Sequence, residues 1–292
     1  MRSLKTLMVC SLFAISILSA GSALGQRGPG GGMGGGGGMR QGGGFQGGFQ
    51  PGQQAGNAAI RNRIQARSYL FEPTGEKLPY AVFLPRKYDK QKPMPLIILL
   101  HGNKVTPESI ITPFGAAADK HGYILVAPMG YNLTGWYGMR GLGDATTTQY
   151  SEQDVMNVLR LARAEFNIDP RRIYIAGHSM GGSGAIHLAV AHPEVWAAVG
   201  AMSAGIIGNM SPDNPGFKDL PVIIEQGDKD ELIPVASVRN WVRSMKESAE
   251  RKAPTEYIEY TGGTHVTPLQ GGAERMLAFF DKYSRPEGSP AP

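Results

Sequence analysis

The sequence is almost without cysteine. Its 292 residues include a single one, Cys10, which lies within an apolar N-terminal segment. A chain that lost this segment on export would contain no thiol. It could then form no disulfide, use no cysteine nucleophile and hold no zinc ion through cysteine ligands.

The sequence also lacks an apolar run of about 20 residues, the length that crosses a bilayer. Its N-terminal apolar segment, residues 7–20, is shorter, follows two basic residues and precedes the small residues Ala23 and Gly25. This order is typical of a secretory signal peptide. We predict a signal peptide at residues 1–25 and a secreted or periplasmic mature chain with no membrane span. An uncleaved N-terminal anchor is the alternative.

Residues 26–57 offer few side chains that could form a core, because half of them are glycine. Such a segment would lose much conformational entropy on folding and bury little apolar surface. We predict a disordered Gly-rich linker over 26–57 that tethers the following domain. Adhesion of this segment to surfaces or partners is the alternative.

Clustered positive charge is absent too, although the net charge is +5. Segment 1–57 carries four basic residues and no acidic residue, which leaves about +1 for residues 58–292. A protein that binds nucleic acid concentrates positive charge on one face. We therefore expect no nucleic-acid partner.

Residues 58–292 alternate short apolar runs with segments of helical periodicity, which predicts one α/β domain. The clearest helix is 151–169, where Ser151 and Asp154 form a capping-box pattern, and residues 131–150 are predicted as a long loop. The predicted strands are 66–72, 79–85, 95–102, 123–130, 171–177, 196–205, 221–227 and 255–263. This pattern indicates a mostly parallel central sheet of about eight strands with helices on both faces.

One junction between a strand and a helix carries a reactive residue type. Residues 177–181, GHSMG, fit the pattern G-x-S-x-G in that context. The glycines permit a strained turn that lifts the Ser179 hydroxyl above the carboxyl edge of the sheet. The N-terminus of the following helix favours negative charge there. We predict that Ser179 is a nucleophile; a glycine-rich turn with an incidental serine is the alternative.

A serine that attacks a carbonyl group needs two donors for the tetrahedral oxyanion. The backbone N–H of Met180, directly after the nucleophile, is one candidate. The other is the N–H of Asn103, because LLHGN at 99–103 ends an earlier apolar strand at the same edge. A strand that simply turns at His-Gly is the alternative.

A base is also needed, and the chain has six histidines. His265 lies in a loop after the last predicted strand, and it is the candidate base. The other five lie within motifs or helices that explain them structurally: His101, His121, His178, His187 and His192. The order serine, acid, histidine is expected on this type of fold. Three acids lie in the intervening loop: Asp228, Asp230 and Glu231.

These motifs resemble those of the α/β-hydrolase superfamily. Within it, the chain is similar to secreted esterases of the polyhydroxybutyrate-depolymerase and feruloyl-esterase type, and to the catalytic domain of prolyl-oligopeptidase-like peptidases. The resemblance covers about residues 60–284 and rests on LLHGN, SEQDVMNVL, IDPRRIYIAGHSMGG, EQGDKDELIP and GGTH. It implies the α/β-hydrolase fold. It also implies that Asp230 is the triad acid, because Gly227, Asp230 and Pro234 match the family pattern G-x-x-D-x-x-hydrophobic-Pro.

The chain departs from this resemblance at two points. Related depolymerases often carry disulfides, and HGN stands where some lipases have HGGG, so no bulky acyl pocket is implied. Three aromatic residues of the predicted loop are candidates to stack on a sugar or an aromatic acyl group: Tyr131, Trp136 and Tyr137. Packing of the loop onto the domain is the alternative.

The predicted function is ester hydrolysis by an exported serine carboxylesterase with the triad Ser179, Asp230 and His265. No metal or organic cofactor is expected. The expected partner is an ester substrate, including one linked to a polysaccharide or polyester. A serine peptidase is the first alternative, disfavoured because the sequence shows no N-terminal propeller. A non-catalytic binding protein of the same fold is the second.

Overall fold

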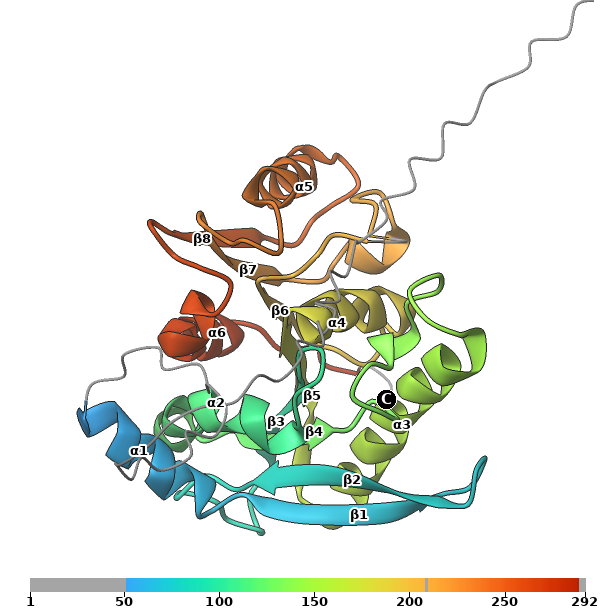
Figure 1. The fold of residues 1–292 in the computed structure, drawn as a ribbon, viewed down its shortest axis with the longest axis vertical. Coiled ribbons are helices and arrows are strands. Elements are labelled where there is room, and N and C mark those ends of the chain that lie inside the picture. The colour runs from blue at the N-terminus through green and yellow to red at the C-terminus, as the bar shows by residue number, and fades with distance from the viewer. Residues whose placement is uncertain (1–50, 208–209, 289–292) are drawn as a thin grey trace, which may run out of the picture. The chain divides into compact units, whose positions relative to one another are not determined.

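An eight-stranded sheet forms the centre of the protein, in the order β1-β2-β4-β3-β5-β6-β7-β8 (Figure 1). The computed structural model describes residues 51–207 and 210–288; the predicted signal peptide and most of the predicted linker lie outside them. The strands are β1 Gln65–Phe71, β2 Glu76–Phe83, β3 Met94–Leu100, β4 Ile124–Pro128, β5 Ile168–His178, β6 Val199–Met202, β7 Val222–Gly227 and β8 Thr255–Tyr260. Only the β1–β2 and β2–β4 pairs are antiparallel. The predicted mostly parallel sheet is confirmed.

Helices cover both faces of this sheet, and each face has its own apolar core (Figure 1). Side chains of α3, α4 and α5 pack on one face, and side chains of α1, α2 and α6 pack on the other. The helices are α1 Pro51–Arg61, α2 Pro107–His121, α3 Ala145–Glu165, α4 Met180–Ala191, α5 Val235–Glu247 and α6 Gly272–Phe280. Within the described ranges, no helix is long and apolar enough to span a bilayer.

Helix α3 begins earlier than predicted, and the predicted capping box is wrong. The helix is capped by Asp144, whose side chain accepts a hydrogen bond from the N–H of Thr147. Ser151 is buried within the helix and accepts a hydrogen bond from the N–H of Tyr137. Asp154 is buried too, and it accepts bonds from two backbone N–H groups and from the Tyr69 hydroxyl. Both residues therefore fix the preceding loop instead of starting the helix.

The first described helix crosses the predicted boundary between linker and domain at residues 57 and 58. Helix α1 begins at Pro51, inside the predicted linker. Ile60 is buried at the end of this helix and packs against Gly115 of α2, where any larger side chain would overlap it. Tertiary packing of this kind stabilises helices more than local propensity does. The contact at Ile60 therefore favours a helix whose first residues belong to the predicted linker.

The register of the parallel strands gathers four loops at one edge of the sheet. Leu100 at the end of β3 pairs with Gly177 of β5, and Gly227 at the end of β7 pairs with Tyr260 of β8. The loops that follow these strands all leave the sheet at its carboxyl edge. In open α/β sheets, ligands bind at that edge.

Candidate active site

Ser179 occupies a sharp turn between β5 and α4. Its backbone has φ 56° and ψ −121°, a conformation that side chains rarely adopt. The turn is held by a hydrogen bond of 2.9 Å from the Ser179 N–H to the carbonyl of Met202 in β6. Strain of this kind persists only where surrounding contacts enforce it, and it is common at functional sites.

The two flanking glycines are required by close backbone contacts. A Cβ at Gly181 would overlap the carbonyl of Leu100, and a Cβ at Gly177 would overlap the carbonyl of Gly181. The helix therefore begins directly against the end of β3. Gly102, in the loop after β3, lies beside Ser179: a Cβ there would be 3.5 Å from the Ser179 Cβ.

His265 and Asp230 form an acid–histidine pair at the same edge. The Nδ1 atom of His265 lies 3.0 and 2.9 Å from the two carboxylate oxygens of Asp230. The Asp230 side chain is fully shielded from solvent, and the His265 side chain is 7% exposed. Among the described residues, no hydrogen bond joins Ser179 to His265. Such bonds are often long before substrate binds.

Asp230 is held ionised by its donors. Burial acts to raise the pKa of this carboxyl, but bonds from the N–H groups of Ile233 and Leu232 and from His265 bring the pKa below its usual value. Both backbone bonds are 2.9 Å long. The side-chain amide of Gln226 donates a further bond of 2.7 Å.

The neighbouring acids have other partners. Asp228 accepts a bond of 2.7 Å from the N–H of Gly262, in the turn that precedes the His265 loop. Glu231 is exposed, and its carboxylate lies 3.4 Å from the N–H of His265. Of the three predicted candidates, Asp230 alone bonds to the imidazole.

The main chain of His265 is fixed as well. Its carbonyl oxygen accepts a bond of 2.7 Å from the Ser203 hydroxyl, and it lies 2.9 Å from Nε2 of His178. Because a carbonyl only accepts, Nε2 of His178 carries the proton. His178 directly precedes Ser179, so this bond connects the serine turn to the histidine loop.

The two predicted oxyanion donors lie at the same edge. Met180 is the first residue of α4, where backbone N–H groups have no partner within the helix. Asn103 is exposed in the turn after β3, next to Gly102. The following residue, Lys104, has φ 61° and donates a bond of 2.9 Å to the carbonyl of Leu133.

Comparison with known proteins shows the family of the chain. The esterase family model matches residues 72–272. The chain belongs to this family. It is therefore a serine hydrolase of carboxylic esters.

Individual esterases are similar over part or most of the chain. The S-formylglutathione hydrolase of Rattus norvegicus is 27% identical over 202 residues, covering 54% of this chain and 71% of the relative. A thermostable esterase structure matches with a TM-score of 0.62 at 23% identity, covering 78% of this chain and 64% of that one. A feruloyl esterase module from Clostridium thermocellum, complexed with sinapinate, gives a TM-score of 0.59 at 18% identity, covering 75% and 88%. These structures share the α/β-hydrolase fold.

The predicted role of Tyr137 in this esterase is wrong, because its side chain is fully buried. Its ring packs against Gly184 of α4, and its hydroxyl donates a bond of 3.1 Å to the carbonyl of His101. Tyr131 packs edge-on against Tyr150, with ring centres 5.2 Å apart, and is half-buried. Trp136 is half-buried and remains a candidate for substrate contact.

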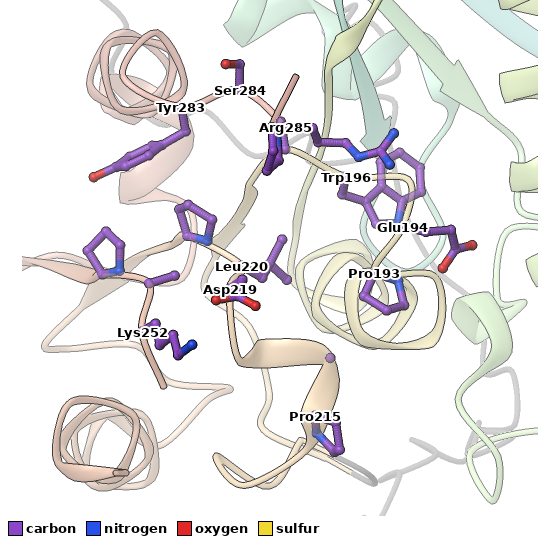
Figure 2. Close-up of a pocket in the computed structure, with 16 residues that line it drawn as sticks. Pro193, Glu194, Trp196, Pro215, Asp219, Leu220, Lys252, Tyr283, Ser284 and Arg285 are labelled. Atoms are coloured by element: carbon purple, nitrogen blue, oxygen red, sulfur yellow. The ribbon is translucent and has the colours of Figure 1, made fainter. Parts of the chain in front are cut away.

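A cavity of about 600 Å³ lies away from this edge (Figure 2). Its lining includes Ala197, Pro221 and Pro254, which precede β6, β7 and β8. It therefore opens at the amino ends of the strands, opposite Ser179. Within the described residues, no cluster of three or more His, Cys, Asp or Glu side chains could hold a metal ion.

Two buried residues of the site were missed in the sequence. Ser203 follows the short strand β6 and has φ 49°, and Gln226 lies within the apolar strand β7. Ser203 belongs to no recognisable motif, and Gln226 lies in EQGDKDELIP at a position to which the family pattern assigns no role. The one available signal was polarity: both interrupt apolar runs that should be buried on both faces.

The burial of His178 predicts a pH-dependent stability. Burial lowers the pKa of His178 to about 4, from about 6.5 in an unfolded chain, so the folded protein keeps it neutral. At a pH between these two pKa values, the unfolded chain binds more protons than the folded protein. Stability from this residue is therefore complete above pH 6.5 and is lost as pH falls towards 4, by up to about 3 kcal/mol. We expect the free energy of unfolding, measured by chemical denaturation at several pH values, to change less steeply with pH in His178→Asn than in wild type between these two pKa values. An unchanged slope would contradict the assignment.

Proposed function

We propose that this esterase hydrolyses carboxylic esters with Ser179 as nucleophile, His265 as general base and Asp230 as the orienting acid. The observation that carries the proposal is the pair of short contacts between His265 Nδ1 and Asp230. With Nδ1 bonded to the acid, Nε2 is left free to accept a proton. Serine esterase family membership supports the same assignment.

The reaction would proceed in two halves. The Ser179 oxygen attacks the ester carbonyl as its proton passes to His265 Nε2, and the N–H groups of Met180 and Asn103 bond the resulting oxyanion. His265 then protonates the departing alcohol, which leaves an acyl-serine. A water molecule gives a proton to His265 and attacks the acyl group, and His265 returns this proton to the Ser179 oxygen as the acid leaves. This scheme requires no metal or organic cofactor.

Removal of the nucleophile is the first test. We expect Ser179→Ala to abolish both the hydrolysis of p-nitrophenyl acetate and labelling by a fluorophosphonate, because no acyl-enzyme can form. Ser68→Ala, at an exposed position on β1, is the control and should behave as wild type. Equal labelling of Ser179→Ala would refute the proposed nucleophile. A wild type that cleaves peptides or thioesters better than oxygen esters would refute the substrate class.

The choice of acid predicts a second series of variants. Asp230→Asn should lose about 10³ to 10⁴ in kcat while remaining folded, because the amide favours the wrong histidine tautomer. Asp228→Ala should mainly lose about 1 kcal/mol of stability through its bond to the N–H of Gly262. Glu231→Gln should change kcat by less than about threefold. We would measure kcat and Tm for all three; a larger kcat loss for Asp228→Ala would show the wrong aspartate was chosen.

We also propose that the chain is exported. The support is the order of basic residues, apolar segment 7–20 and small residues at the N-terminus. N-terminal sequencing of the protein recovered from medium or periplasm should give a chain that begins at Gln26. An intact Met1 would indicate the uncleaved anchor.

A further inference from the structure

Large aliphatic side chains are exposed close to the candidate active site. In the described ranges, five large hydrophobic residues are exposed: Leu70, Val105, Leu133, Leu232 and Val266. Leu232 is 65% exposed and its N–H bonds to Asp230, while Val266, 42% exposed, directly follows His265. These two lie on the acid and histidine side of the site.

The other side of Ser179 carries a matching pair. Val105, 42% exposed, lies on the same loop as Gly102, which is beside Ser179. Leu133, 38% exposed, accepts a bond at its carbonyl from the N–H of Lys104, so the two residues lie on joined segments. Only Leu70 is elsewhere, on β1, with three strands between it and β5.

Two half-buried isoleucines add to this surface. The side-chain ends of Ile207 and Ile233 lie 3.1 and 3.5 Å from where a Cβ on Gly205 would be, so they meet over that glycine. The carbonyl of Gly205 accepts a bond from Ser183 in the first turn of α4, directly after Ser179. We define the apolar rim as Val105, Leu133, Ile207, Leu232, Ile233 and Val266.

Single exposed apolar side chains are common on protein surfaces. A cluster of them on functional loops marks a binding surface. The rim lies on both sides of the reacting serine, so whatever covers it must also present the bond to be cut. The exposed charges beside it have both signs: Lys104, Lys229 and Glu231. An anionic membrane surface would be matched by a basic cluster. The rim therefore fits a neutral apolar partner.

We propose that the apolar rim seats the surface of an aggregated neutral aliphatic ester, so that Ser179 acts on esters at an interface. The proposal rests on the hydrolytic function proposed above. Contact with the aggregate buries the rim side chains and removes water from around the serine, which favours binding through the hydrophobic effect. A small polar ester in solution contacts few of these side chains.

The test uses two substrates and two variants of the full-length protein. Leu133→Ser/Val266→Ser removes one exposed aliphatic side chain from each side of the serine, and Leu70→Ser removes an exposed leucine outside the rim. Rates are measured on dissolved p-nitrophenyl acetate and on tributyrin below and above its solubility limit. We expect wild type and Leu70→Ser to gain rate when tributyrin forms an emulsion.

The double variant should keep its rate on p-nitrophenyl acetate within about threefold, and its rate on the emulsion should fall about tenfold or more. Equal losses on both substrates, or an equal emulsion loss in Leu70→Ser, would overturn the proposal. A wild type that cleaves the dissolved ester without any gain on the emulsion would refute the rim and leave the proposed function intact. A wild type inactive on both would refute the function itself. If size-exclusion chromatography shows that the double variant dissociates a dimer, the rim is a contact between copies.

Discussion

The site depends on two places where backbone lies directly against backbone at a glycine. The carbonyl of Leu100 occupies the position that a Cβ on Gly181 would take, and the carbonyl of Gly263 does the same at Gly227. The first contact brings the start of α4 against the end of β3, which sets Ser179 next to the loop that carries Gly102 and Asn103. The second brings the end of β7 against the loop that carries His265. A side chain at either glycine would overlap this backbone, so the two segments would have to move apart.

Between these contacts, His265 is fixed at both its ring and its backbone. Asp230 holds Nδ1, while Ser203 and His178 converge on the carbonyl oxygen. Ser203 adopts φ 49° to reach it, and Ser179, one strand away, has φ 56°. The two strained residues are linked through β6, because the N–H of Ser179 bonds to Met202, immediately before Ser203. Strained backbone persists where surrounding contacts enforce it, and here the same contacts fix the position of His265.

Motifs that depend on local backbone geometry could be predicted from the sequence, and features that depend on distant packing could not. The turn at Ser179 needs glycines at fixed spacing, and parallel strands need long apolar runs, so both leave a pattern. Tyr137 looked like a loop aromatic because nothing local shows that Gly130 and Gly184 make room for its ring. Asp154 matched a capping box, yet its partners are 24 and 85 residues away. Such contacts are decided by tertiary structure, which overrides local propensity.

The four acids between residues 225 and 231 show how geometry, not proximity in sequence, decides which carboxylate bonds to His265. Glu225 lies within β7 and faces α6, where burial raises its pKa to about 7 despite a hydrogen bond from a tyrosine hydroxyl. An acid only about half ionised at neutral pH would stabilise an imidazolium poorly. The Asp230 side chain is shielded as well, but Asp230 has left the strand, and the loop that it enters supplies two N–H donors, from Leu232 and Ile233. These donors and His265 lower its pKa in spite of burial and leave it ionised. Asp228 lies at the end of the strand, and its carboxylate accepts a hydrogen bond from the N–H of Gly262 in the neighbouring turn. Glu231 is exposed. A position just beyond the sheet edge is therefore what makes Asp230 both charged and within reach of the histidine.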